Sequence, residues 1–194
     1  MPVQILIVTL IVEKIVDDKS KKEKMKKVNA VINVFFGEIG SECIAVLTKF
    51  IGNFEELRGY ITITDGWLDG DFDKSIIKLR NFHYVDAPGP YDFEKFKLFL
   101  SYKKQFMLSM FENQNLLDHD EFTDMLWALL HILDELEFRG NLEYLSEEDT
   151  RHILVDIKRA YVNILIVWVH YMQNIKGKYP YLYKFLLKTQ HDFV

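Results

Sequence analysis

Residues 151–172, RHILVDIKRAYVNILIVWVHYM, decide the fold class that the sequence predicts. At the advance of about 100° per residue of an α-helix, apolar side chains cover most of the circumference, so this helix must be packed on more than one side. Its polar side chains form one narrow stripe, made of His152, Asp156, Arg159, Asn163 and His170. The stripe is either a thin strip of surface or a line of polar groups facing other helices. A transmembrane role fits less well, because the apolar run is too short for a span.

The remaining chain also favours helices, because apolar residues recur at spacings of three and four. Helix boundaries are marked by Asp92, by Ser146 with Asp149 and by Gly140, which are residue types typical of helix caps. The sequence therefore predicts an all-α protein, a helical bundle of about five to six helices with an N-terminal apolar helix.

Two parts of the chain differ in character. Residues 1–27 combine an apolar segment with a lysine-rich segment, and residues 28–194 read as a single helical-bundle domain without repeats or a second core. One alternative is a strand pair between residues 3–12 and the β-prone residues 60–64, YITIT. An isolated strand pair is only marginally stable, so we favour the helical interpretation.

The N-terminal sequence PVQILIVTLIVEKIV, residues 2–16, indicates contact with a membrane. Its apolar residues cover every face of a helix, and lysines follow on the C-terminal side, as they do where the next domain stays in the cytoplasm. The length is the main objection, because residues 3–16 rise only about 21 Å as a helix. A buried edge of the bundle or a protein–protein contact is the alternative. The residues expected to touch the membrane are Ile5, Leu6, Ile7, Val8, Leu10, Ile11, Lys19, Lys21 and Lys22.

Four long stretches of the sequence resemble a family of uncharacterised prokaryotic proteins. They are KMKKVNAVINVFFGEIGSE (24–42), LLDHDEFTDMLWALLHILDELEFR (116–139), HILVDIKRAYVNILIVWVHYM (152–172) and KYPYLYKFLLKT (178–189). The resemblance covers almost the whole chain from Lys24 onward. It implies an N-terminal transmembrane segment ahead of a cytoplasmic helical domain, and it implies no functional residue. The apolar segment of this chain is shorter than the one expected for the family.

Carboxylates and histidines recur on the helices in a way that could serve a metal ion. Asp124, His131 and Glu135 share one helix face, and neutral imidazoles with carboxylates suit iron, manganese or zinc. Glu42 falls on the apolar stripe of the first long helix. The spacing lacks the paired Glu-x-x-His signature of ferritin-like bundles. The candidate ligands are Glu42, His131, His152 and Asp156, and the alternative is a stripe of simply hydrogen-bonded polar groups.

Several functional classes are disfavoured by composition and motifs. The net charge is −5, and residues 112–149 carry twelve acids against one base, so nucleic acid is not an expected partner. No phosphate loop, nucleophile elbow or dinucleotide fingerprint is present, and we expect no catalytic residue. The lone Cys43 is expected to be a buried, inert thiol. The sequence thus predicts a membrane-associated, cytoplasm-facing interaction domain that contacts the membrane through its N-terminus, with another protein or a second copy as a further expected partner. A metal-binding bundle is the alternative.

Overall fold

Helix α8 runs through the middle of the structure, a computed structural model that describes the backbone of residues 2–117 and 119–190. Side chains are described for residues 14–114, 116 and 119–190. The described helices are α1 (Pro2–Phe35), the π-helical turn η1 (Phe36–Gly40), α2 (Ser41–Thr48), α3 (Phe54–Ile61), α4 (Asp69–Asn81), α5 (Phe93–Phe111), α6 (Gln114–Leu117), α7 (Asp120–Arg139), α8 (Glu147–Lys178) and α9 (Pro180–Thr189). The predicted all-α fold is confirmed. The helices outnumber the expected five or six because short helices such as α3 and α6 fill the connections.

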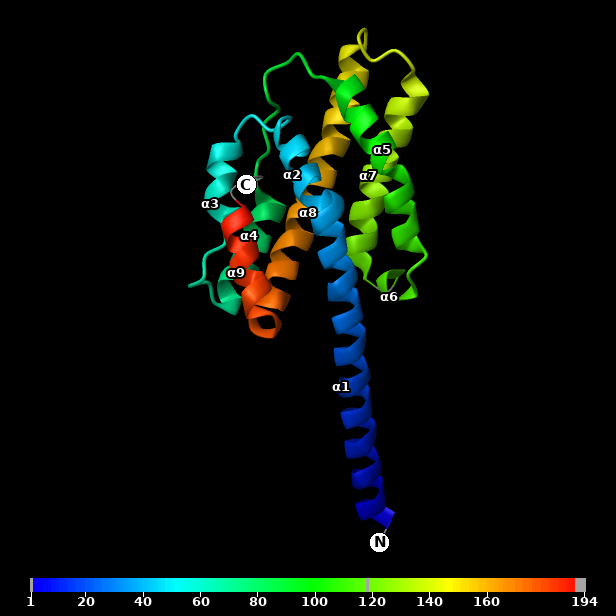
Figure 1. The fold of residues 1–194 in the computed structure, drawn as a ribbon, viewed down its shortest axis with the longest axis vertical. Coiled ribbons are helices and arrows are strands. Elements are labelled where there is room, and N and C mark those ends of the chain that lie inside the picture. Colours follow the sequence, from blue (N-terminus) through cyan, green and yellow to red (C-terminus); the bar gives the residue numbers. More distant parts are fainter. Residues whose placement is uncertain (1, 118, 191–194) are drawn as a thin grey trace.

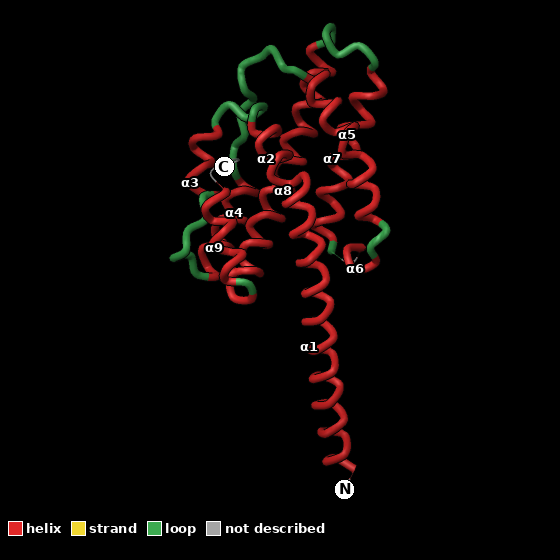
Figure 2. Tube along the Cα trace, in the orientation of Figure 1, coloured by secondary structure: helices red, strands yellow, loops and turns green. Residues whose placement is uncertain are grey.

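Other helices enclose α8 on both sides. Helices α7 and α5 lie on one side, and α3, α4 and α9 lie on the other, while α2 packs across the front in the view of Figure 1. Figure 2 shows that loops are confined to the ends of the helices. Tyr161, Leu165 and Trp168 of α8 have no exposed surface, and Trp168 meets the ring of Phe36 edge-on at 5.1 Å between centroids. The central position predicted for residues 151–172 is therefore confirmed.

The predicted caps define the ends of the helices that frame α8. The backbone N–H of Asp149 donates to Ser146 Oγ at 3.0 Å at the start of α8, and that of Lys95 donates to Asp92 Oδ1 at 2.9 Å at the start of α5. Gly140 follows the end of α7 with φ of 70°, a left-handed conformation that favours glycine. These caps fix where the polar face of α8 begins relative to α7.

Helix α1 projects out of the bundle as a long stalk (Figure 1). As an α-helix it is about 51 Å long, and among its described side chains, from Lys14 onward, the first buried one is that of Val28. Between residues 14 and 27 the side chains are exposed, except that Met25 is half-buried. The stalk therefore holds its lysines away from the protein, and the bundle begins one residue after the lysine-rich segment ends.

One N-terminal helical segment, Lys14–Thr48, is long and apolar enough to cross a membrane by length and composition, although no membrane is part of the structure. Of its most apolar window, 44% is buried inside the protein, so part of this apolar character belongs to the bundle core. The backbone of the predicted membrane-contact residues 5–11 is helical. Their side chains lie outside the described residues, and Lys19, Lys21 and Lys22 are exposed.

The π-helical turn changes which residues of the first long segment face the core. A π-turn accommodates one extra residue, so the helix beyond it is rotated relative to an uninterrupted α-helix. Cys43, Ile44 and Leu47 consequently face the core, whereas Glu42 points to solvent. The predicted position of Glu42 on the apolar stripe is wrong for this reason.

The alternative strand pair between residues 3–12 and 60–64 is wrong. Residues 3–12 are helical, and the extended Ile63 pairs instead with a side chain: its N–H donates to Gln190 Oε1 at 3.1 Å, and Gln190 Nε2 donates to its carbonyl at 2.7 Å. Tyr183 adds a hydrogen bond from its hydroxyl to the carbonyl of Thr64 at 3.0 Å. Two side chains that follow α8, those of Tyr183 and Gln190, thus form hydrogen bonds with backbone groups of residues 63–64 in place of a partner strand.

The π-turn offers a matched test of the core packing. A Cβ added at Gly40 would lie 2.5 Å from Cδ1 of Phe36 and 2.8 Å from Cε1 of Phe35, and both rings are buried. Gly40→Ala should therefore lower the free energy of unfolding by about 1–3 kcal/mol, measured by urea denaturation. Nothing lies within 4 Å of a Cβ at Gly37, so Gly37→Ala should stabilise the protein by up to about 1 kcal/mol. Equal effects of the two variants would contradict this packing.

Candidate metal centre

The polar stripe of α8 faces α7 and forms a seam of charged and polar side chains. Because a short loop joins the two helices, they run antiparallel, and residues from each pair off in reverse order along the seam. The atom pairs and distances are Arg139 Nε–Asp149 Oδ1 at 3.2 Å, His152 Nε2–Glu135 Oε2 at 3.8 Å, His131 Nε2–Asp156 Oδ2 at 3.4 Å and His170 Nδ1–Glu121 Oε2 at 3.5 Å. The stripe thus faces another helix and also stays accessible from the surface.

Two histidines converge on the same carboxylate oxygen at the middle of the seam. Asp156 Oδ2 lies 3.4 Å from Nε2 of His131 and 3.5 Å from Nε2 of His152. Hydrogen bonds between nitrogen and oxygen are normally about 2.7–3.2 Å long, so both separations are long for direct bonds. Ligands of a tetrahedral zinc ion, each at about 2.0–2.1 Å from the metal, are separated by about 3.3–3.4 Å along each edge. The observed spacing matches that edge.

Asp156 is a buried charge with one oxygen left over. Its side chain is 3% exposed, and Oδ1 accepts a hydrogen bond from Nη2 of Arg159. Oδ2 is buried and accepts no hydrogen bond from the described residues. A buried carboxylate oxygen is costly unless a cation or a donor compensates it. A protonated imidazole of His131 or His152, or a cation bound between the two rings, could compensate this oxygen.

Glu135 completes the cluster from the α7 side. One ligand atom each from His131, Glu135 and His152 lies within 4.8 Å of the others. Oε2 of Glu135 also accepts a hydrogen bond from Nη1 of Arg139, and this bond is the main reason that the pKa of Glu135 lies below its usual value. Glu135 is thus charged at neutral pH, but it is shared between Arg139 and the cluster.

Arg139 is itself positioned by the cap of α8. Its Nε donates to Asp149, whose Oδ2 accepts a hydrogen bond from the hydroxyl of Ser146 at 2.6 Å. The hydrogen bonds from Ser146 and then Arg139 lower the pKa of Asp149. The helix cap and the cluster therefore form one connected network, in which Arg139 and Asp149 support the groups that could hold an ion.

The cluster is open to solvent on one side. The side chains of His131 and His152 are 50% and 53% exposed, so a metal ion held by them would keep coordination positions for water or a ligand. A cavity of about 340 Å³ lies next to His131, between α7 and α8. Its lining residues are Asp124, Trp127, Ala128, His131, Arg159 and Asn163.

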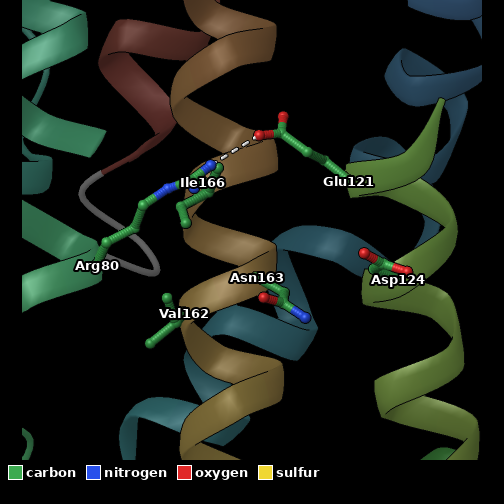
Figure 3. A pocket seen from close by; sticks show the side chains of 6 residues that line it. All are labelled: Arg80, Glu121, Asp124, Val162, Asn163 and Ile166. Carbon is green, nitrogen blue, oxygen red and sulfur yellow. Dashed lines mark hydrogen bonds and ion pairs between the residues drawn. The ribbon is translucent and has the colours of Figure 1, made fainter. Parts of the chain in front are cut away.

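A second cavity continues the groove along the same seam. It has a volume of about 270 Å³ and shares Asp124 and Asn163 with the first. Figure 3 shows Arg80 of α4 and Glu121 of α7 reaching toward each other across α8, with their atoms 3.0 Å apart, and Asn163 extending toward Asp124. The groove therefore runs from the cluster past Asn163 to an ion pair at its other end.

Three of the four predicted metal ligands come together, and the fourth does not. His131, His152 and Asp156 form the cluster, whereas Glu42 lies on α2 and pairs with Lys103 Nζ at 3.1 Å. Glu135 stands near where a fourth ligand would be. The sequence places Glu135 on the same helix face as His131, but its contact with His152 depends on the register between α7 and α8, which no local pattern gives.

Cys43 has no role in such a site. Its side chain is fully buried, and burial raises the pKa of the thiol to about 12. A thiol with this pKa is protonated at neutral pH and is a poor nucleophile or metal ligand. The expectation of a buried, inert thiol agrees with this environment.

Comparison with known proteins identifies relatives of the helical domain. Residues 24–188 match the family described as "Uncharacterized protein MJ1433, C-terminal helical domain". The chain is 35% identical over 189 residues to the uncharacterized protein MJ1433 of Methanocaldococcus jannaschii, an alignment that covers 97% of this chain and 76% of that protein. No solved structure matches. The resemblance to an uncharacterised prokaryotic family with a helical domain is thereby confirmed, while the anchor and the cytoplasmic placement stay predictions.

The burial of Asp156 predicts unequal effects when its ion pair with Arg159 is broken from either side. Arg159→Ala should lower the free energy of unfolding by about 3 kcal/mol in metal-free buffer, because it leaves a buried carboxylate without its cation. Asp156→Asn should cost only about 1 kcal/mol, because Arg159 is 59% exposed and returns to water. Urea denaturation measures both values. Equal losses would mean that the histidines, and not Arg159, balance the carboxylate.

Proposed function

The chain belongs to the family of the MJ1433 C-terminal helical domain, and we propose that this domain binds a divalent transition metal through His131, His152 and Asp156. The observation that carries the proposal is Oδ2 of Asp156, a buried oxygen without a hydrogen bond that lies 3.4 and 3.5 Å from the two Nε2 atoms. The three atoms come from two helices whose packing is fixed by the core.

The ligand types narrow the choice of metal. Two imidazoles and one carboxylate suit zinc, iron or manganese, and the same set holds catalytic zinc ions that keep water as a further ligand. Glu135 lies close enough to approach that water or the ion itself, since its Oε2 is 3.8 Å from Nε2 of His152. Arg139 and Arg159 bind the carboxylates from outside and orient them, as partners of metal ligands commonly do.

A purely structural seam is the competing explanation for the same residues. Alternating charges along two packed helices stabilise a bundle without any ion, and Arg139 with Glu135 and Asp149 is such an arrangement. That explanation accounts for the ends of the seam. At the centre of the seam it requires a protonated histidine, whereas a metal ion would engage both imidazoles and the buried oxygen at once, which is why we favour a metal.

Calorimetric titration of the chelator-treated full chain with zinc tests this function. We expect one ion per chain in the wild type. His131→Ala, His152→Ala and Asp156→Asn should each weaken zinc binding by about 100-fold or more, because each removes one of few ligands.

Two variants serve as controls for the zinc titration. Glu42→Gln and His170→Ala change a carboxylate and a histidine that lie outside the cluster, so zinc affinity should stay within about twofold of the wild type. Binding that is equally weak in wild type and variants, or that depends on Glu42 or His170, would remove the proposed centre.

Membrane association through α1 is a second candidate function. The supporting observation is that α1 leaves the bundle and exposes the lysines of residues 14–27, next to the apolar sequence at residues 3–12. Lysines beside an apolar segment attract anionic lipid headgroups while the apolar segment enters the acyl region. In this proposal the domain is an interaction or scaffold module on the cytoplasmic side of a membrane, where it meets another protein or a second copy.

Vesicle flotation of the full chain tests the membrane proposal. Binding to vesicles that contain anionic phosphatidylglycerol should exceed binding to neutral phosphatidylcholine vesicles. Replacing Lys19, Lys21 and Lys22 by Gln should weaken the anionic binding by about 100-fold at low salt, since each lysine near the surface contributes about 1 kcal/mol. Ile7→Glu should reduce binding to both kinds of vesicle.

A matched triple variant distinguishes an effect of the stalk lysines from a general effect of positive charge on vesicle binding. Lys49, Lys78 and Lys184 are exposed on the bundle, and their replacement by Gln removes the same charge without touching α1. This control should bind vesicles as the wild type does. Equal losses in both triple variants, or no flotation of the wild type, would count against a role of α1.

A further inference from the structure

The cavity next to His131 places a cation-binding cluster beside an arginine with donors to spare. Arg159 uses one N–H to reach Asp156 Oδ1, while its side chain is 59% exposed and lines the cavity. A guanidinium carries several N–H donors in a planar fork that suits carboxylate and phosphate oxygens. Because Arg159 and His131 line the same cavity, a metal held by His131 and the guanidinium of Arg159 would border one open space.

The order of groups along the cavity defines a polarity. His131 lies at one end of the cavity, Arg159 lines it from α8, and Asn163 follows Arg159 one helical turn later. Figure 3 shows Asp124 on α7 opposite Asn163 of α8. Asp124 precedes His131 by seven residues, or about 10 Å along α7. With a metal ion bound, positive charge would lie at the His131 end beside Arg159, while Asp124 supplies a negative charge at the other end.

We propose that this cavity receives a small oxyanion, the carboxylate or phosphate group of a ligand, which fills the open coordination position of the metal and is bound by Arg159. The inference rests on the metal centre proposed above. An oxyanion is favoured because it can bind a metal ion and a guanidinium at once, with charge-assisted hydrogen bonds to the latter. A neutral ligand would make no use of Arg159.

Asp124 restricts which oxyanions fit. Its carboxylate repels a second negative charge at the far end of the cavity, so the ligand carries its negative group toward the metal and a neutral or cationic group toward Asp124. The cavity of about 340 Å³ is larger than a free phosphate ion and leaves room for such a group. Trp127, 61% exposed, provides an apolar wall alongside.

The test measures binding of inorganic phosphate and, separately, acetate to the full chain saturated with zinc. We expect binding of one or both probes to the zinc-loaded wild type, and at least about tenfold weaker binding to the zinc-free chain. The probe that binds more tightly identifies phosphate or carboxylate as the preferred group. Titration calorimetry at saturating zinc keeps metal affinity out of the comparison.

Substitutions at the two ends of the cavity should act in opposite directions. Arg159→Lys keeps the charge near Asp156 but loses the planar fork, and we expect about tenfold weaker probe binding. Asp124→Asn removes the opposing charge and should strengthen binding several-fold. Arg80→Lys is the control, because Arg80 lies at the far end of the groove and pairs with Glu121, so probe affinity should not change.

The outcomes separate this inference from the metal centre on which it rests. Stoichiometric zinc binding without measurable probe binding overturns the oxyanion site and leaves the metal centre intact. The same holds if Arg159→Lys and Asp124→Asn bind the probe as the wild type does. Failure of the wild type to bind zinc overturns both, and opposite effects of the two substitutions in the zinc-loaded chain support the site.

Discussion

The enclosure of α8 is the constraint on which the rest of the structure depends. A helix with apolar side chains around most of its circumference has to be covered on nearly every side, and here α2, α4, α7 and α9 do so. The one polar stripe that remains cannot be placed in such a core without partners. It therefore lies along the contact with α7, whose own polar face supplies acids and histidines in the reverse order. Fold and candidate site are consequences of the same helix.

The seam carries two kinds of interaction that differ in what they require. At its two ends, Arg139 and Arg80 meet the partly exposed carboxylates of Asp149 and Glu121. Ion pairs that keep contact with water affect stability less than buried charges do. At its centre, Asp156 is almost completely removed from water, so its balance of charge matters far more. A buried carboxylate between two accessible imidazoles is an expensive arrangement for a structural role alone. In the proposed metal centre, this carboxylate would serve as a ligand.

Much of this could be predicted from local patterns, and the failures have identifiable causes. The apolar circumference of residues 151–172 predicted the central helix, and Ser146 with Asp149 and Gly140 marked helix ends where they occur. The stripe itself was visible, but the pairing of Glu135 with His152 depends on the register between two helices. Glu42 was misplaced because a π-turn is not encoded by any spacing of apolar residues. Ile63 was predicted in a strand because residues 60–64 are β-prone. Its partner is the side chain of Gln190, which no local pattern could indicate because it is distant in sequence.

The π-turn has a further consequence for the stalk. Helices α1 and α2 continue into each other through η1, so the stalk and the domain share one continuous helical path. One extra residue in a helix changes the rotational phase of everything beyond it by about 100°. The single turn at residues 36–40 therefore determines which face of the stalk is aligned with the α7–α8 seam. The orientation of the cavity relative to a surface that binds the stalk therefore depends on this turn. Inserting or deleting one residue there would rotate the cavity by about 100° relative to that surface.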